Sequence, residues 1–307
     1  MKINVNKSYT MKGHSDCVYT VVAAKNSEMV YSGAGDGMVV RWSLQDPENG
    51  KLIAKVNASV YALAYQPQSN CLLIGQNYDG IHFIDVDDLQ KNHSIKITDK
   101  AIFDIACLGN KIFVADGGGT VTIIDSEKMS ILKHINIATE SARCIAINPV
   151  LGEFAVGFSD NKIRVFDLQS LHLKHTIDAH ANSVFCLQYS PDNQHLLSGS
   201  RDAHLKIWDT KLNYQLQESI VAHMYTINHM AYSPDGRLFA TASIDKSIKI
   251  WDAARFKLLK VLDKARHAGH GTSVNKLCWS EYHDRLVSCS DDRTLSIWEL
   301  SYNETAI

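Results

Sequence analysis

A twelve-residue segment recurs along the chain, and its spacing constrains the fold more than any other feature. Four clear copies carry an Asp six residues before a Trp: SGAGDGMVVRWS at 32–43, SGSRDAHLKIWD at 198–209, TASIDKSIKIWD at 241–252 and SCSDDRTLSIWE at 288–299. Three weaker copies, near 76–85, 115–125 and 158–167, have Ile84, Ile124 and Phe166 where the others have Trp. The marker positions are 42, 84, 124, 166, 208, 251 and 298, which indicates seven repeats with a period near 42.

Each repeat contains short runs of alternating apolar residues separated by turns. The segment at 180–200 reads HANSVFCLQYSPDNQHLLSGS, and the segment at 223–243 reads HMYTINHMAYSPDGRLFATAS. The Ser-Pro-Asp sequence favours a tight reversal and interrupts any strand. No sustained helical period is present. The repeating unit is therefore predicted to be strand, turn, strand, turn, strand, followed by a more polar connection.

The residues at the ends of the repeats resemble those of a known family. Gly13-His14, Gly269-His270, the three Trp-Asp or Trp-Glu endings and the period are similar to the WD-repeat family. The resemblance implies an all-β, seven-bladed β-propeller whose blades are four-stranded antiparallel sheets. It covers essentially the whole chain, although repeats two to four lack the His and the Trp. We expect a single domain over 1–307, with repeats at 12–45, 54–87, 96–127, 137–169, 179–211, 222–254 and 269–300.

The last repeat ends soon after its third strand, LSIWEL, and so lacks a fourth strand. Residues 2–10, KINVNKSYT, alternate in polarity and precede the first repeat His. Propellers of this family close their ring by pairing the two ends of the chain, which removes open sheet edges. We therefore expect residues 2–10 to complete the last blade.

A His, a Ser or Thr, an Asp and a Trp recur together in repeats one, five, six and seven. The sets are His14, Ser32, Asp36, Trp42; His180, Ser198, Asp202, Trp208; His223, Thr241, Asp245, Trp251; and His270, Ser288, Asp292, Trp298. Each set has the ingredients of a Ser-His-Asp nucleophile system, but four copies of one catalytic site would be unusual. The resemblance implies instead a structural tetrad of hydrogen bonds. In it the indole N–H donates, the hydroxyl and the imidazole each donate and accept, and the carboxylate accepts.

The resemblance also implies partner contacts on the top face of the propeller, around the central channel. The positions are the third and fifth residues after the repeat His and the residue before the turn Asp. The third-residue column holds only small residues. The fifth-residue column holds Tyr19, Tyr61, Phe103, Arg143, Phe185, Asn228 and Asn275, and Arg201 and Asp291 precede their turn Asp residues at the periphery. Aromatic rings and Arg are frequent hot-spot residues, and such rings can hold a partner's Lys or Arg by cation–π attraction. The alternative is that these rings pack against one another where blades meet.

Charge and cysteine content argue against several classes of function. With 31 basic and 33 acidic side chains, the chain has no field that would recruit nucleic acid or an anionic membrane. The seven cysteines include no pair at the spacing of zinc ribbons, which favours reduced thiols in a cytoplasmic protein. His267 and His270 are three residues apart, a spacing that could hold a metal on a helix, but we expect a surface loop there. No apolar run is long enough to cross a membrane, and we expect neither a metal nor another cofactor.

The leading functional expectation is a non-catalytic scaffold that binds peptide segments or partner domains, as a monomeric propeller within a larger complex. One alternative is a propeller enzyme, such as a hydrolase or lyase, which would need converging ionisable residues at the channel mouth. The aligned columns hold aromatic residues, small residues and one Arg, which disfavours that alternative. A further alternative is a subunit of an RNA-associated assembly complex that reaches RNA through protein partners.

Overall fold

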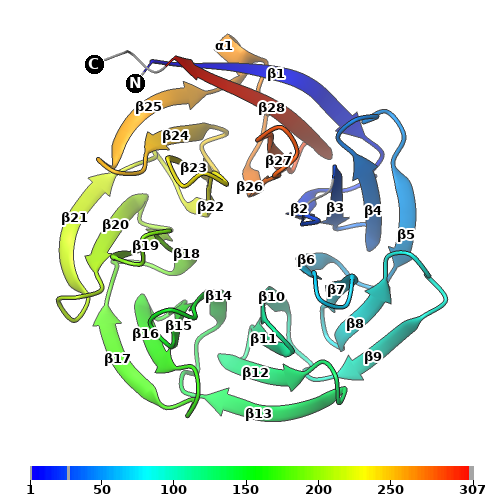
Figure 1. The fold of residues 1–307 in the computed structure, drawn as a ribbon, viewed down its shortest axis with the longest axis vertical. Helices are drawn as coiled ribbons and strands as arrows, with labels where there is room; N and C mark the ends of the chain where they lie inside the picture. The colour runs from blue at the N-terminus through cyan, green and yellow to red at the C-terminus, as the bar shows by residue number, and fades with distance from the viewer. Residues whose placement is uncertain (1, 26–27, 304–307) are drawn as a thin grey trace. The chain divides into compact units, whose positions relative to one another are not determined.

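The computed structural model describes residues 2–25 and 28–303, and its sheets are seven four-stranded antiparallel units (Figure 1). Six of the sheets are built from four strands that are consecutive in sequence. The seventh combines three strands from the end of the chain with the first strand. The predicted all-β, seven-bladed β-propeller is therefore confirmed. We number the blades 1 to 7 in the order of their first strands after β1.

The strands group into two compact units. Unit 1 comprises residues up to 59 and from 228 onward, with blades 1, 6 and 7, and unit 2 comprises 60–227, with blades 2 to 5. The elements of blades 1, 6 and 7 are β2 Val18–Ala23, β3 Met29–Ala34, β4 Met38–Ser43, β5 Lys51–Lys55; β22 Ile227–Tyr232, β23 Leu238–Ser243, β24 Ile248–Asp252, β25 Lys257–Leu262; and β26 Val274–Trp279, β27 Leu286–Ser290, β28 Thr294–Asn303, β1 Lys2–Lys12.

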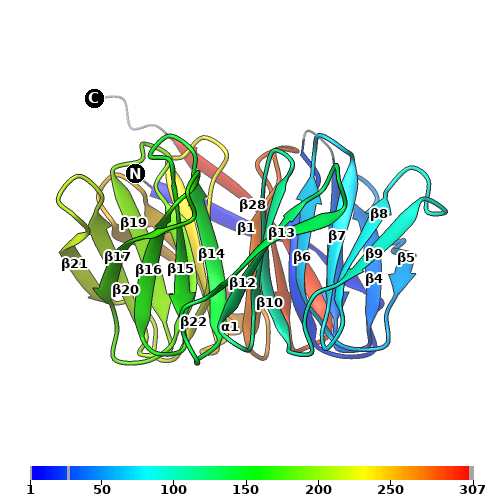
Figure 2. The same ribbon diagram turned by 90° about the horizontal axis from the view of Figure 1, so that it is seen from below.

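Unit 2 repeats the same four-strand arrangement, and Figure 2 shows β14, β15 and β16 of blade 4 from the side. The elements of blades 2 to 5 are β6 Val60–Gln66, β7 Cys71–Gln76, β8 Gly80–Asp85, β9 Asn92–Lys96; β10 Ile102–Leu108, β11 Lys111–Asp116, β12 Thr120–Asp125, β13 Ser130–Asn136; β14 Ala142–Asn148, β15 Glu153–Phe158, β16 Lys162–Asp167, β17 Leu173–Asp178; and β18 Val184–Tyr189, β19 His195–Ser200, β20 His204–Asp209, β21 Gln215–Val221.

The N-terminal strand completes the last blade, as predicted. In Figure 1, β1 runs beside β28, and the two pair antiparallel from Lys2 opposite Asn303 to Lys12 opposite Thr294. The strand extends two residues beyond its predicted end at Thr10. Since β1 is the outermost strand of its sheet, it covers an edge of β28 that would otherwise be open to another chain.

Burial within a blade falls from the second strand to the outer strand. Every residue of β15 and of β23 is buried, whereas most residues of β13 and β21 are exposed. A strand that is packed on both faces reads as a nearly continuous apolar run, while the outer strand meets water. The strict alternation expected for a half-exposed sheet is therefore missing from the most buried strands.

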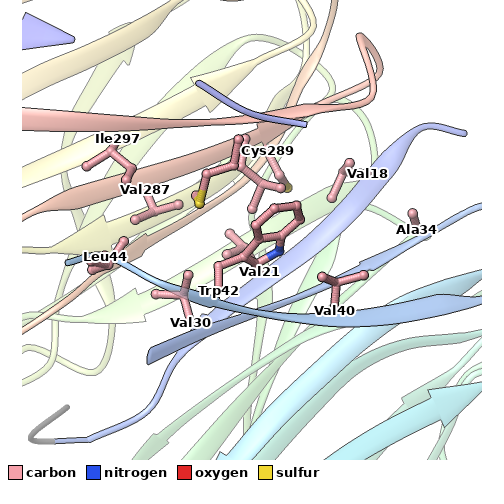
Figure 3. Packing of buried hydrophobic residues seen from close by; sticks show 12 residues of the cluster. Val18, Val21, Val30, Ala34, Val40, Trp42, Leu44, Val287, Cys289 and Ile297 are labelled. Carbon is pink, nitrogen blue, oxygen red and sulfur yellow. The ribbon is translucent and has the colours of Figure 1, made fainter. Parts of the chain in front are cut away.

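A buried cluster in unit 1 shows how blades 1 and 7 pack together. Figure 3 shows the Trp42 ring among side chains of blade 1, such as Val21, with Val287 and Cys289 of blade 7 close by. Trp42 is 1% exposed and Val287 and Cys289 have no exposed surface. Burying a ring of this size contributes a few kcal/mol, so the repeated Trp is a major source of cohesion between these two blades.

The segment before the seventh repeat contains a short helical turn, where the sequence predicted only a loop. Helix α1, Lys264–His267, is capped by Asp263, whose side chain accepts a hydrogen bond from the N–H of Arg266. Its four residues are too few for a bilayer-spanning helix, and no other helix occurs between residues 2 and 303 outside the gap at 26–27.

Candidate partner-binding site

The predicted partner-binding residues lie on the first strands of their blades, and a shared backbone irregularity sets their direction. In six blades the register of the first two strands shifts at this residue, at Tyr19, Tyr61, Phe103, Arg143, Phe185 and Asn275. A β-bulge places an extra residue in one strand and redirects its side chain. In blade 5, for example, Val184 and Cys186 are both buried while Phe185 between them is only half-buried.

Four of these residues form one continuous stack in unit 2. The rings of Tyr61 and Phe103 are nearly parallel, with centroids 6.1 Å apart and an interplanar angle of 15°. The Cζ atom of Arg143 lies 4.1 Å from the Phe103 centroid and 5.1 Å from the Phe185 centroid. All four side chains are half-buried. We call Tyr61, Phe103, Arg143 and Phe185 the aromatic–arginine stack.

The Arg143 guanidinium is also fixed by a hydrogen bond. Its Nε donates to Ser159 Oγ over 2.9 Å. Burial lowers the pKa of Arg143, and the like charge of the exposed Arg201 acts in the same direction. Ser159 was missed in the sequence, although it directly precedes Asp160 and so occupies the column that holds Arg201. Aligning that column through blade 4 would have found it.

Two of the three corresponding residues in unit 1, Asn228 and Asn275, are engaged in amide hydrogen bonds. The Nδ2 of Asn228 donates to Ser273 Oγ over 3.0 Å, and the Nδ2 of Asn275 donates to the Val18 carbonyl over 2.9 Å. Asn275 Nδ2 also donates to Asp291 Oδ1 over 2.7 Å. The structure thus brings the predicted Asn275 and Asp291 together, and it uses both asparagines to join neighbouring strands within unit 1.

The tetrad residues form hydrogen-bonded chains. In blade 5, Trp208 Nε1 donates to Ser198 Oγ over 2.9 Å, Ser198 Oγ lies 2.8 Å from His180 Nε2, and His180 Nδ1 lies 3.0 Å from Asp202 Oδ2. A neutral imidazole with its proton on Nδ1 satisfies this chain. The same contacts occur in two further sets: His14, Ser32, Asp36 and Trp42, and His270, Ser288, Asp292 and Trp298. In the fourth set, Trp251 Nε1 donates to Thr241 Oγ1 over 2.9 Å, and His223 and Asp245 lie in the same blade.

The environment of the tetrads favours a structural role. Burial lowers the pKa of His14 and of His180, despite the nearby carboxylates. Burial acts to raise the pKa of Asp202, but hydrogen bonds from His180 and from backbone N–H groups lower it overall. The Ser198 hydroxyl has no exposed surface, so it cannot attack an external substrate. Across the described residues, no three His, Cys, Asp or Glu side chains are grouped as metal ligands would be.

The sequence matches the model of the family described as WD domain, G-beta repeat, over residues 6–43, 171–209, 214–252 and 257–299, slightly more than half of the chain. The chain belongs to the WD40 family. Its matched segments hold all four tetrad Trp residues, and they leave out residues 44–170.

Two relatives and one solved structure extend this assignment. The WD40 chain is 26% identical over 206 residues to THO complex subunit 3 of Arabidopsis thaliana, covering 66% of this chain and 64% of that protein. It is 23% identical over 241 residues to mouse striatin, covering 70% of this chain and 31% of striatin. The chain therefore spans less than two thirds of the length of either relative. The crystal structure of the WD40 β-propeller domain of Doa1 has a TM-score of 0.85 at 18% identity and covers 98% of both chains, which supports the fold.

The aromatic–arginine stack of this WD40 protein belongs mainly to the blades with degenerate repeats. Tyr61, Phe103 and Arg143 lie within residues 44–170, and only Phe185 lies in a matched segment. Blades 2 to 4 lack the tetrad His and Trp but carry three of the four residues of the stack. Chemically, this surface offers aromatic rings and one guanidinium group.

Proposed function

We propose that this WD40 protein is a non-catalytic protein-interaction scaffold that binds peptide segments or partner domains through the aromatic–arginine stack. The observation that carries the proposal is the alignment of four half-buried side chains, each from a different blade of unit 2. Rigid aromatic rings supply large contact area at low cost in side-chain entropy, and Arg is enriched with them among interface hot spots. The proposal takes this surface to be the top face that the resemblance to the family implies.

Two further observations support a role within an assembly. The name of the Arabidopsis relative, THO complex subunit 3, describes that protein as a subunit of a complex. The near balance of 31 basic and 33 acidic side chains favours protein partners over direct contact with nucleic acid.

We also propose a reducing, cytoplasmic location, because all seven cysteines are free thiols and four of them are buried.

Affinity capture with matched variants tests the proposal. Phe185→Ala and Tyr61→Ala remove half-buried rings from the stack, whereas Leu216→Ala trims a side chain that is 44% exposed on the outer strand β21 of the same unit. We expect wild type and Leu216→Ala to capture the same partners and both ring variants to lose them, with little change in thermal midpoint. Equal capture by all four proteins would contradict a binding role for the stack.

A further inference from the structure

The stack already contains a cation between two of its rings. The sequence alone suggested that these rings would hold a Lys or Arg of the partner. In the structure, the guanidinium of Arg143 lies over both Phe103 and Phe185, at 4.1 and 5.1 Å from their centroids. Those two ring faces are therefore occupied by the chain's own positive charge, and the chemistry presented to a partner is that of a guanidinium framed by aromatic rings.

The charge of Arg143 is not neutralised by a neighbouring carboxylate. Within residues 2–25 and 28–303 its side chain makes one hydrogen bond, from Nε to Ser159, and no ion pair, so both Nη atoms lack an acceptor. Burying a charge without a counter-charge is costly. A bound anion would reduce that cost, and groups whose pKa is shifted by burial cluster at functional sites.

Nearby acidic side chains are directed elsewhere. Asp160 follows Ser159, but it is paired with Arg164, whose Nη2 lies 2.6 Å from Asp160 Oδ2. Asp104 follows Phe103 in β10 and accepts a hydrogen bond from the backbone N–H of Ile145 over 2.9 Å.

A second cation reinforces the positive character of the site. Arg201 is exposed, and its charge is close enough to act on Arg143. Among the described residues, the Arg201 guanidinium makes no hydrogen bond or ion pair. Two guanidinium groups without carboxylate partners thus lie close enough for their like charges to interact.

We propose that Arg143 binds the side-chain carboxylate of an Asp or Glu in an extended peptide segment, through paired hydrogen bonds from its two Nη atoms. A planar guanidinium matches a carboxylate with two parallel N–H···O bonds. Rings lie on both sides of Arg143, so apolar side chains before and after the acidic residue can pack on them. That symmetry favours an internal acidic residue over a chain terminus. The proposal rests on the stack being the partner-binding surface.

A peptide array tests this inference directly. Octapeptides that are N-acetylated and C-amidated, with aromatic or aliphatic flanks, carry Glu, Gln, Lys or phosphoserine at one central position. A parallel set without an acidic side chain ends in a free carboxylate. The proteins are wild type, Arg143→Gln, Arg143→Lys, the ring variant Phe185→Ala, and the control Arg255→Gln, which alters an exposed Arg paired with Asp252 in unit 1.

We expect wild type and Arg255→Gln to bind central-Glu peptides about tenfold more tightly than their Gln counterparts, as charge-assisted paired hydrogen bonds predict. Arg143→Gln should lose this preference, and Arg143→Lys should retain only part of it because an ammonium cannot form the fork. If Arg143→Gln fails to fold, Ser159→Ala provides the test, since releasing Nε should weaken the Glu preference several-fold.

Each other outcome overturns the inference in a specific way. Preference for Lys would mean that Arg143 moves aside for an incoming cation, and preference for phosphoserine or for the free terminus would assign the site to that anion. A Glu preference that survives Arg143→Gln would place the carboxylate elsewhere. Ring-dependent peptide binding without any acid preference would overturn carboxylate recognition alone, whereas absence of all ring-dependent binding would overturn the scaffold function as well.

Discussion

In blade 5 the turn aspartate, Asp202, is held by a buried imidazole, whereas in blade 4 the equivalent Asp160 is held by the guanidinium of Arg164. The imidazole of His180 continues through Ser198 to the indole of Trp208. Blade 5 therefore connects its turn to its core by a chain of hydrogen bonds.

Blade 4 replaces every member of that chain except the aspartate. Its Phe166 occupies the position of the Trp and Val156 that of the Ser. The Phe166 ring stacks on Phe154, with centroids 5.0 Å apart and an angle of 13°, and Phe154 in turn contacts Phe113 at 4.9 Å. The comparison shows that a buried polar chain can be exchanged for apolar packing when donors and acceptors disappear together, so that none is left unpaired.

The largest expected effect is the loss of either buried ring. Phe166→Ala and Trp208→Ala each remove a ring that is at most 4% exposed, so each should lower the free energy of unfolding by about 3–5 kcal/mol. Urea denaturation monitored by circular dichroism measures both. If Phe166→Ala lowered the free energy of unfolding by less than about 1 kcal/mol, blade 4 would not depend on its aromatic packing.

A smaller effect is expected from breaking the hydrogen-bonded chain alone. Ser198→Ala leaves the Trp208 N–H and the His180 Nε2 unpaired in the interior and should cost about 1–3 kcal/mol. In a Trp208→Phe background the same substitution should cost less, because one of the unpaired groups is already gone. Ser219→Ala, on the exposed face of β21, serves as the control. Strictly additive effects would show that Ser198 and Trp208 are not energetically coupled.

The smallest expected effect is a pH dependence of stability that arises from the buried imidazoles. Burial lowers the pKa of His180 in the folded protein below its ordinary value of 6.5. Below that pH, the His180 ring therefore binds a proton more readily in the unfolded chain than in the folded protein. Stability is therefore complete above this value and decreases as the pH falls. Thermal midpoints between about pH 7.5 and about pH 5 should decline, and the decline should be shallower in His180→Ala. An unchanged slope would show that His180 does not contribute to the pH dependence. Burial acts to raise the pKa of Asp160 in blade 4, but the hydrogen bond from Arg164 lowers it overall, so this carboxylate stays ionised over the same range.

The sequence was sufficient for the architecture because its signals are local and repeated. The Asp and Trp markers, the turn residues and the alternating runs predict each blade, and the strand count predicts the pairing of β1. The stack of Arg143 between two rings was not predictable in the same way. It depends on a bulge that has no sequence signature and on how side chains of neighbouring blades meet. A column alignment gives the order of these residues around the blades but not the directions of their side chains.

The same limit explains the other differences. The sequence showed that blade 4 lacks its Trp and His, but not that Arg164 would take over the turn aspartate. It identified Asn228 and Asn275 as candidate contacts, but not that their amides would be committed to hydrogen bonds within unit 1. A side chain with several hydrogen-bond donors can pair with many acceptors, and the residues that surround it in the folded protein determine which acceptor it uses.

The pairing of β1 with β28 also has a consequence for how the protein folds. Synthesis produces β1 long before its partner, so the contact between them has a very large sequence separation and a high entropic cost of closure. Until β28 is available, β1 presents an unpaired strand to other chains. Acquisition of the native state should therefore be limited by this last step, and the fully synthesised but unclosed chain is the form most prone to strand exchange and aggregation.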